Sequence, residues 1–266
     1  MDPEIVEHYE RGVELDRLAN GSSRIEFERT KELLSRHLPP PPARVIDVGG
    51  GPGVYAEWLA ALGHHVELVD PVPMHVEEAA RRASSAAPPF GTSVGDARSL
   101  AFADASFDAV LLLGPLYHLT ERDDRRRAIR EAARVARAGA IIAAAVISRF
   151  ASLLDGLVNG YLQDERFRAI VERDLKDGQH RNPTRDAAFF TSAYFHHPDD
   201  VLPELEAGGL EPIGLVGVEG PSWLRSEVWD EAGGKDAILF VARAAEREPS
   251  LLGASAHLLA FARRPG

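Results

Sequence analysis

The sequence predicts an α/β protein built on a doubly wound, mostly parallel sheet, and three features support this prediction. Residues 45–60 have the pattern of a strand, a glycine-dense turn and a helix. Short apolar segments then alternate with helical segments up to residue 147, the order that a parallel sheet with crossover helices requires. Residues 107–113 form a near-continuous apolar run, typical of a central strand buried on both faces.

Two helices are predicted ahead of the first strand, over residues 4–19 and 22–38. The Asn-Gly-Ser-Ser segment at 20–23 suits the end of one helix and the start of the next. The proline run at 39–42 ends the second helix, because proline cannot continue it. We expect residues 1–42 to form a helical cap.

The later elements follow from apolar spacing and from turn residues. Two segments compete for the seventh strand: residues 237–242 have helical spacing, whereas 256–262 is short and bounded by Ser255 and Arg263. We predict the strand at 256–262. The other strands are predicted at 66–70, 92–94, 107–113, 141–147 and 210–218, and helices at 121–136, 150–176 and 198–207.

Composition limits the class of partner. The 266 residues include 30 basic and 41 acidic side chains, and the net charge of -11 disfavours a broad nucleic-acid-binding surface. Cysteine is absent, which excludes disulfides and thiolate metal sites. The first four residues, Met-Asp-Pro-Glu, do not begin a signal segment, and no stretch has the apolar length of a bilayer span. We expect a soluble, cytoplasmic protein with no membrane partner.

The glycine-dense turn is expected to hold a nucleotide-like ligand, because glycine permits positive φ and close approach, and the next helix presents free N–H groups. A dinucleotide fingerprint would place glycine or alanine at Val54. Here the glycines are Gly49, Gly51 and Gly53, and Asp47 precedes them. This Asp-x-Gly-x-Gly-x-Gly pattern closely resembles motif I of the class I S-adenosylmethionine-dependent methyltransferases, whose acid and glycine loop hold the amino-acid end of the cofactor.

The resemblance is specific over residues 43–147 and implies a Rossmann-like, seven-stranded sheet with an antiparallel last strand. It also implies S-adenosylmethionine as cofactor and S-adenosylhomocysteine as product. The expected organisation is a single methyltransferase domain over 1–266. Its parts are the N-terminal helical cap at 1–42, a cofactor-binding core at 43–148, a helical substrate lid at 149–200, and C-terminal strands and helices at 201–266.

Two acids at strand ends are expected to contact the nucleoside. Asp70 ends the second strand about 20 residues after the first glycine, where nucleotide-binding α/β units place a carboxylate on the ribose. Pro71 follows and is expected to wall the adenine. The resemblance implies that Asp96 accepts from the adenine amino group and that the backbone at Ala97 meets a ring nitrogen. Asp96 could instead cap a turn or helix.

Residues 114–119 (Gly-Pro-Leu-Tyr-His-Leu) strongly resemble the motif IV region of many small-molecule methyltransferases, which lies beside the reactive methyl. Leu113 and Gly114 are expected to contact the cofactor. Tyr117 is a candidate for shaping the pocket or bonding the acceptor, and core packing is the alternative. His118 is the first candidate for a general base or substrate orienter, because histidine titrates near neutral pH.

The N-terminal helices and the lid supply weaker candidates. In the resembling family a tyrosine followed by an arginine-bearing helix often contacts the methionine carboxylate; here these are Tyr9 with Arg24 or Arg29, and a solvated helix face is the alternative. In the lid, His196 and His197 are further candidates for the base. Tyr194 and His196 are candidate substrate contacts, and core packing explains such aromatic residues equally well.

The predicted reaction is methyl transfer to a small-molecule acceptor, with oxygen or nitrogen favoured; the acceptor and the oligomeric state stay open. Asp123 and Asp124 are adjacent, but acids at a helix start complement its dipole, so we predict no metal. Alternatives are a cyclase, rearrangement catalyst or sensor that keeps the cofactor pocket without methyl transfer, a nicotinamide-dependent oxidoreductase, which Val54 disfavours, and an RNA methyltransferase, which the net charge disfavours.

Overall fold

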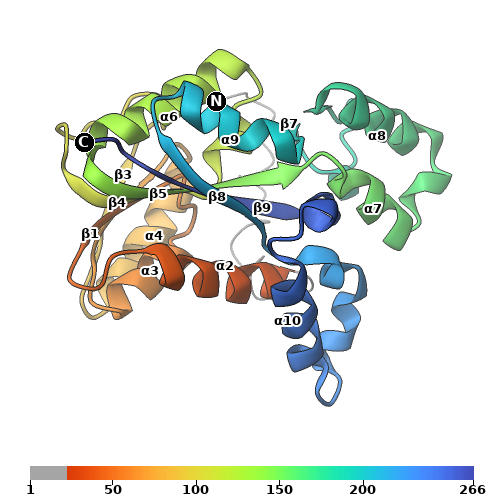
Figure 1. Ribbon diagram of the computed structural model, residues 1–266, viewed down its shortest axis with the longest axis horizontal. Helices are drawn as coiled ribbons and strands as arrows, with labels where there is room; N and C mark the ends of the chain where they lie inside the picture. The colour runs from red at the N-terminus through yellow and green to blue at the C-terminus, as the bar shows by residue number, and fades with distance from the viewer. Residues whose placement is uncertain (1–22) are drawn as a thin grey trace.

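The computed structural model describes residues 23–266, and across them the chain forms a nine-stranded sheet with helices on both faces (Figure 1). The helix predicted at 4–19 lies outside the described residues. The strands are β1 (Arg44–Val48), β2 (His65–Asp70), β3 (Gly91–Val94), β4 (Phe107–Leu112), β5 (Ala136–Ser148), β6 (Gln179–His180), β7 (Ala193–His196), β8 (Glu211–Gly217) and β9 (His257–Arg263).

Helices cover both faces of the sheet, with α2, α3 and α4 on one side and α6 and α9 on the other (Figure 1). None of the described helices has the length and apolar character needed to cross a membrane. The helices are α2 (Ser23–His37), α3 (Val54–Ala61), α4 (Pro73–Ser85), α5 (Pro115–His118), α6 (Arg122–Val135), α7 (Ala151–Val158), α8 (Glu165–Asp177), α9 (Pro198–Ala207) and α10 (Gly234–Ala245), and the 3₁₀ segments are η2 (Tyr161–Gln163), η3 (Ala187–Phe189), η4 (Gly220–Asp230) and η5 (Pro249–Ala254).

The strand order is β3-β2-β1-β4-β5-β7-β6, and β1, β2, β3, β4 and β5 pair in parallel. Strand β9 runs antiparallel between β5 and β8, which confirms the predicted strand at 256–262. The competing segment, 237–242, lies in α10, as its helical spacing indicates. The sequence did not predict β6 and β7. Strand β6 has two residues, and β7 has four within a segment crowded with aromatic residues and histidine that the sequence assigned to the lid.

The central strand β4 shows why its sequence is apolar throughout. Val110 and Leu112 pack into the core cluster beneath α6 and α9, whereas Ala109 and Leu111 pack into the cluster beneath α2 and α3. All four side chains are fully buried. Since alternate residues of a strand point to opposite faces, a strand covered on both sides needs apolar residues at every position.

The segment predicted as one helix over 150–176 is broken into α7, η2 and α8. Gly160 has φ of 76°, a conformation that ends a regular helix and suits glycine. Asp164 then caps α8, because its side chain accepts a hydrogen bond from the backbone N–H of Arg166. Two local signals, a glycine and an N-cap aspartate, therefore override the apolar pattern that joins the two helices.

Candidate cofactor and acceptor site

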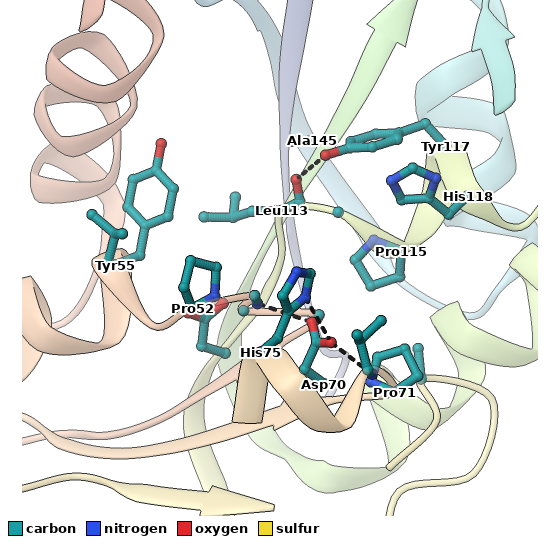
Figure 2. A pocket seen from close by; sticks show the side chains of 18 of the residues that line it. Pro52, Tyr55, Asp70, Pro71, His75, Leu113, Pro115, Tyr117, His118 and Ala145 are labelled. Carbon is teal, nitrogen blue, oxygen red and sulfur yellow. Dashed lines mark hydrogen bonds and ion pairs between the residues drawn. The ribbon is translucent and has the colours of Figure 1, made fainter. Parts of the chain in front are cut away.

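A pocket lies at the carboxyl ends of the parallel strands, the edge where open α/β sheets bind ligands (Figure 2). Its wall comes from the glycine loop after β1, the end of β2, the loop after β3 and the turn into α5. Eleven of the residues that the sequence singled out line it: Asp47, Gly49, Gly51, Asp70, Pro71, Asp96, Ala97, Leu113, Gly114, Tyr117 and His118.

The glycine loop has the backbone that its sequence predicts, with positive φ at Gly49, Gly51 and Gly53 of 72°, 55° and 87°. A Cβ on Gly49 would lie 2.8 Å from Cγ of Pro115, so only glycine lets the loop pack against α5. A Cβ on Gly51 would meet no described atom within 4 Å. Gly51 lines the pocket, and its open side leaves room for a ligand to approach the backbone.

Asp47, one residue before the end of β1, has a fully buried side chain and lines the pocket. Neither oxygen has a hydrogen-bond partner among residues 23–266. Burial, with a smaller contribution from the charge of Asp70, raises the pKa of Asp47 to about 7. An orphaned carboxylate is costly to bury and needs an explanation. A cationic group in the pocket would supply one, and the ammonium of the cofactor's amino-acid end fits this position.

Asp70 is buried and ties two elements together (Figure 2). One carboxylate oxygen accepts the backbone N–H of Gly51 at 2.9 Å, and the other accepts that of Val72 at 2.9 Å and lies 3.2 Å from Nδ1 of His75. The carboxylate therefore holds the glycine loop against the start of α4. Its contact with a ribose stays a prediction, and His75 is a pocket residue that sequence reasoning missed.

Asp96 lines the pocket as predicted, but its carboxylate is held by Arg98. The guanidinium Nη2 of Arg98 lies 2.6 Å from Oδ2, and its Nη1 bonds Asp124 at 2.7 Å. The hydrogen bond from Arg98 lowers the pKa of Asp96, so the group is ionised. Asp124 thus belongs to an ion-pair chain. The adenine contact of Asp96 stays a prediction.

The turn after β4 brings Tyr117 and His118 into the pocket (Figure 2). The hydroxyl of Tyr117 donates to the carbonyl of Leu113 at 3.2 Å. The His118 ring meets Tyr117 edge to face, with ring centroids 4.6 Å apart, and lies 6.2 Å from the ring of Phe190. The predicted lid packs behind this wall, where Tyr117 shares an apolar cluster with Ala193 and Phe195. No residue from 149 to 200 lines the pocket in the described structure.

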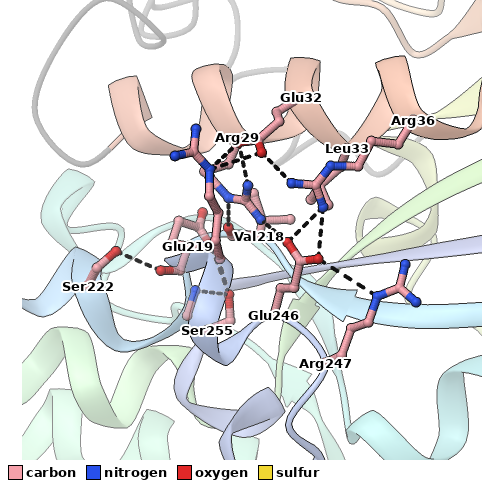
Figure 3. A network of polar contacts seen from close by, with 12 residues as sticks. Arg29, Glu32, Leu33, Arg36, Val218, Glu219, Ser222, Glu246, Arg247 and Ser255 are labelled. Carbon is pink, nitrogen blue, oxygen red and sulfur yellow. Dashed lines mark hydrogen bonds and ion pairs between the residues drawn. The ribbon is translucent and has the colours of Figure 1, made fainter. Parts of the chain in front are cut away.

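Arg29 does not line the pocket, and its predicted cofactor contact is wrong for this structure (Figure 3). Its fully buried guanidinium donates to the carbonyl of Val218 at 3.1 Å and to the carboxylates of Glu32 and Glu246. Helix α2 packs against α10 and β9, so the hydrogen bonds of Arg29 join α2 to the C-terminal part of the fold. Arg24 is paired with Asp230 at 2.7 Å, and Tyr9 lies outside the described residues.

The three lid candidates also lie away from the pocket. His196 is buried, with Nε2 2.9 Å from Glu204, and burial lowers its pKa. His197 caps α9 by accepting the backbone N–H of Asp199. The ring of Tyr194 lies 3.7 Å from the guanidinium of Arg125. Because β7 joins the sheet beside β5, these side chains pack against α6 and α9, and their predicted roles as base or substrate contact are corrected to structural ones.

Glu26 and His257 are pocket residues that the sequence did not single out. Glu26 lies in α2, and His257 is the first residue of β9. A third residue, Glu219, bonds His257 from the turn after β8. No local spacing joins positions so far apart along the chain, so only the folded chain reveals the group.

Comparison with known proteins agrees with this geometry. Residues 45–139 match the methyltransferase domain family. A ubiquinone biosynthesis O-methyltransferase of Methylocella silvestris is 33% identical over 132 residues, 45% of this chain and 50% of that protein. A malonyl-[acyl-carrier protein] O-methyltransferase of Methylococcus capsulatus is 32% identical over 167 residues, 59% of each. A solved S-adenosylmethionine-dependent methyltransferase of Methanosarcina mazei shares the fold with a TM-score of 0.58 at 17% identity, covering 88% of this chain and 97% of its own.

The fold and the pocket thus define a Rossmann-like methyltransferase domain. Residues 45–139, the part that the family model matches, form a methyltransferase domain, and the chain shares its fold with a solved S-adenosylmethionine-dependent methyltransferase. The chain spans about half to three-fifths of the length of the curated relatives described above, 50% and 59%. The activity of the whole protein and its acceptor are therefore matters for proposal.

The raised pKa of Asp47 predicts a pH-dependent stability of the ligand-free protein. The ordinary value of 3.8 rises to about 7 in the fold, so the folded state holds a proton that the unfolded chain releases between those values. The contribution of Asp47 to stability is therefore largest below about pH 4 and is lost as the pH rises to 7. In urea unfolding at pH 4 to 8, Asp47→Asn should gain stability relative to wild type up to about pH 7 and then level off.

The exposed Asp123→Asn serves as the control for the Asp47 series and should show no such divergence. Parallel stability profiles for wild type and Asp47→Asn across this pH range would contradict the prediction.

The network around Arg29 predicts a large effect of Glu246→Gln. Removing that charge leaves a fully buried guanidinium with one ionised partner fewer, and breaking a buried pair typically costs about 3 kcal/mol. Urea unfolding should show a loss of that order, whereas the exposed Glu206→Gln on α9 should change stability little. Equal effects of the two variants would show that the network does not stabilise the fold.

Proposed function

We propose that the protein transfers a methyl group from S-adenosylmethionine to a small-molecule acceptor at oxygen or nitrogen. The observation that carries this proposal is the orphaned, buried carboxylate of Asp47 beside a glycine loop with positive φ. An ammonium placed there would ionise Asp47 and restore its missing hydrogen bonds. The family match over residues 45–139 supports the same ligand.

The remaining cofactor contacts extend from Asp47 along the pocket wall. Asp70, at the end of β2, is proposed to bind the ribose hydroxyls, and Pro71 is proposed to pack on the adenine; both residues line the pocket. Asp96 and the backbone of Ala97 follow β3 and are proposed to meet the adenine edge. These residues hold the cofactor by charge and hydrogen bonds that the fold already positions, which limits the entropy lost on binding.

The acceptor is proposed to bind beside the turn after β4, against Tyr117 and His118. The cofactor supplies an activated methyl group on its sulfonium when bound. Displacement at such a carbon needs alignment of the nucleophile more than covalent help, so the protein's task is to orient the acceptor, exclude water and hold its proton. The names of the two curated relatives support oxygen as the acceptor atom.

The proposal is tested by calorimetric titration of the purified protein with S-adenosylmethionine, S-adenosylhomocysteine and NAD. We expect micromolar binding of the first two and none of NAD. Asp47→Asn should weaken S-adenosylmethionine binding by a factor of about 10 to 100, the loss of one charge-assisted bond. Binding of NAD alone would identify an oxidoreductase instead.

Two further readouts complete the test. Because ligand-free Asp47 is mostly protonated below pH 7, cofactor binding at pH 6.5 should release a proton, seen as a dependence of the binding heat on buffer ionisation enthalpy that Asp47→Asn lacks. Release of S-adenosylhomocysteine in the presence of an acceptor marks methyl transfer. A cofactor that binds and is never consumed across an acceptor screen would favour the cyclase or sensor alternative.

A further inference from the structure

Three side chains from distant parts of the chain meet at one wall of the pocket. Nδ1 of His257 lies 2.7 Å from Oε1 of Glu219 and 3.9 Å from Oε2 of Glu26. Glu26 and His257 line the pocket, and the side chain of Glu219 is 2% exposed. A histidine whose Nδ1 is bonded to a buried carboxylate presents Nε2 as the nitrogen for ligand chemistry.

Glu219 is itself fixed, which makes the orientation of the imidazole definite. Its second oxygen, Oε2, lies 2.9 Å from the hydroxyl of Ser255 and accepts the backbone N–H of His257 at 3.0 Å. Ser255 is fully buried, and its hydroxyl accepts the N–H of Glu219 and of Gly220, both at 3.1 Å. A carboxylate held on both oxygens can fix the tautomer and the plane of the ring that it bonds.

The sheet register places this dyad on the acceptor side of the pocket. His257 pairs with Ile147 near the end of β5, the strand next to β4. The turn after β4 carries Tyr117 and His118, whereas the glycine loop follows β1 on the other side of β4. His118 lies on the same side of the pocket, with ring contacts to Tyr117 and Phe190. The hydrogen bond between Glu219 and His257 supplies the orienting carboxylate that a general base requires.

We propose that His257, positioned by Glu219, accepts the proton of the acceptor during methyl transfer; the inference rests on the function proposed above. Nε2 takes the proton from the acceptor O–H or N–H as the acceptor atom forms its bond to the methyl carbon. The carbon–sulfur bond breaks, and its electron pair stays on sulfur as S-adenosylhomocysteine forms. Nδ1 keeps its proton against Glu219, whose charge stabilises the imidazolium.

The dyad also defines the class of acceptor. A hydroxyl or amine has a proton to give, whereas an ionised carboxylate has none and needs no base. The carboxylates of Glu26 and Glu219 stand within reach of the His257 ring, and like charges disfavour an anionic group at that wall. The acceptor is therefore a hydroxyl- or amine-bearing small molecule.

The test compares wild type with His257→Asn, which keeps a donor for Glu219 but removes Nε2, and with Glu219→Gln. His65→Asn is the matched control, because His65 is exposed at the amino end of β2, far from the carboxyl edge. Calorimetry with S-adenosylhomocysteine comes first, and all four proteins should bind it equally. If wild type does not bind S-adenosylhomocysteine, the proposed function itself fails.

Turnover is then measured as S-adenosylhomocysteine release with catechol, tyramine and a malonyl thioester of N-acetylcysteamine. Wild type should methylate catechol or tyramine and leave the malonyl carboxylate unchanged. His257→Asn should lower kcat by about 100-fold or more and should lose the acidic limb of the wild-type pH profile, with activity rising with hydroxide instead. His65→Asn should match wild type.

A second readout does not depend on turnover. Nitrogen-15 NMR of the imidazoles in the ligand-free protein should show His257 protonated at Nδ1 with Nε2 titrating, and Glu219→Gln should shift that tautomer equilibrium. The inference would be overturned if the tautomer of His257 did not change in Glu219→Gln, or if His257→Asn kept the wild-type kcat. It would also be overturned if wild type turned over the malonyl probe alone, or bound the cofactor and turned over neither catechol nor tyramine. Stoichiometric Zn²⁺ binding that Glu26→Gln abolishes would overturn it too, because it would identify a metal site.

Discussion

The buried carboxylate of Asp47 is the constraint on which the site depends. It lies one residue before the end of β1 and is fully buried. A charge in such a place is stable only with a partner, and the fold provides none among the described residues. Burial without a partner raises the pKa of Asp47, and the cation proposed to bind there would stabilise its charge.

Comparison with Asp70 shows that burial at a strand end does not by itself leave a carboxylate without hydrogen-bond partners. Asp70 is also buried at a strand end, one strand away, yet its carboxylate accepts backbone N–H groups of Gly51 and Val72. The same glycine loop thus gives a donor to one acid and none to the other. The charge of Asp70 adds to the cost of ionising Asp47 and so contributes to its raised pKa.

The sequence predicted those strands and helices whose pattern of apolar and turn residues is contained within a short segment. The strand, turn and helix around Asp47, the parallel strands up to β5, and β9 itself were all readable because their patterns repeat within a few residues. Arg29 and His196 could not be placed this way. The fate of Arg29 depends on Glu246, 217 positions away, and that of His196 on whether β7 joins the sheet. A charged or aromatic residue on a helix or strand is equally compatible with pocket and scaffold until its distant partners are known.

The antiparallel insertion of β9 explains how the C-terminal part of the chain reaches the site. The parallel strands bring their last residues to the pocket edge, whereas an antiparallel strand brings its first residue there. His257 is that residue, and the end of β8 beside it brings Glu219, 38 positions earlier in sequence. The edge therefore collects acids from both halves of the chain, while Arg98, the arginine among the described lining residues, is neutralised by Asp96 and Asp124. A negative field of this kind attracts cations, which is consistent with the cofactor and the protonated acceptor proposed above.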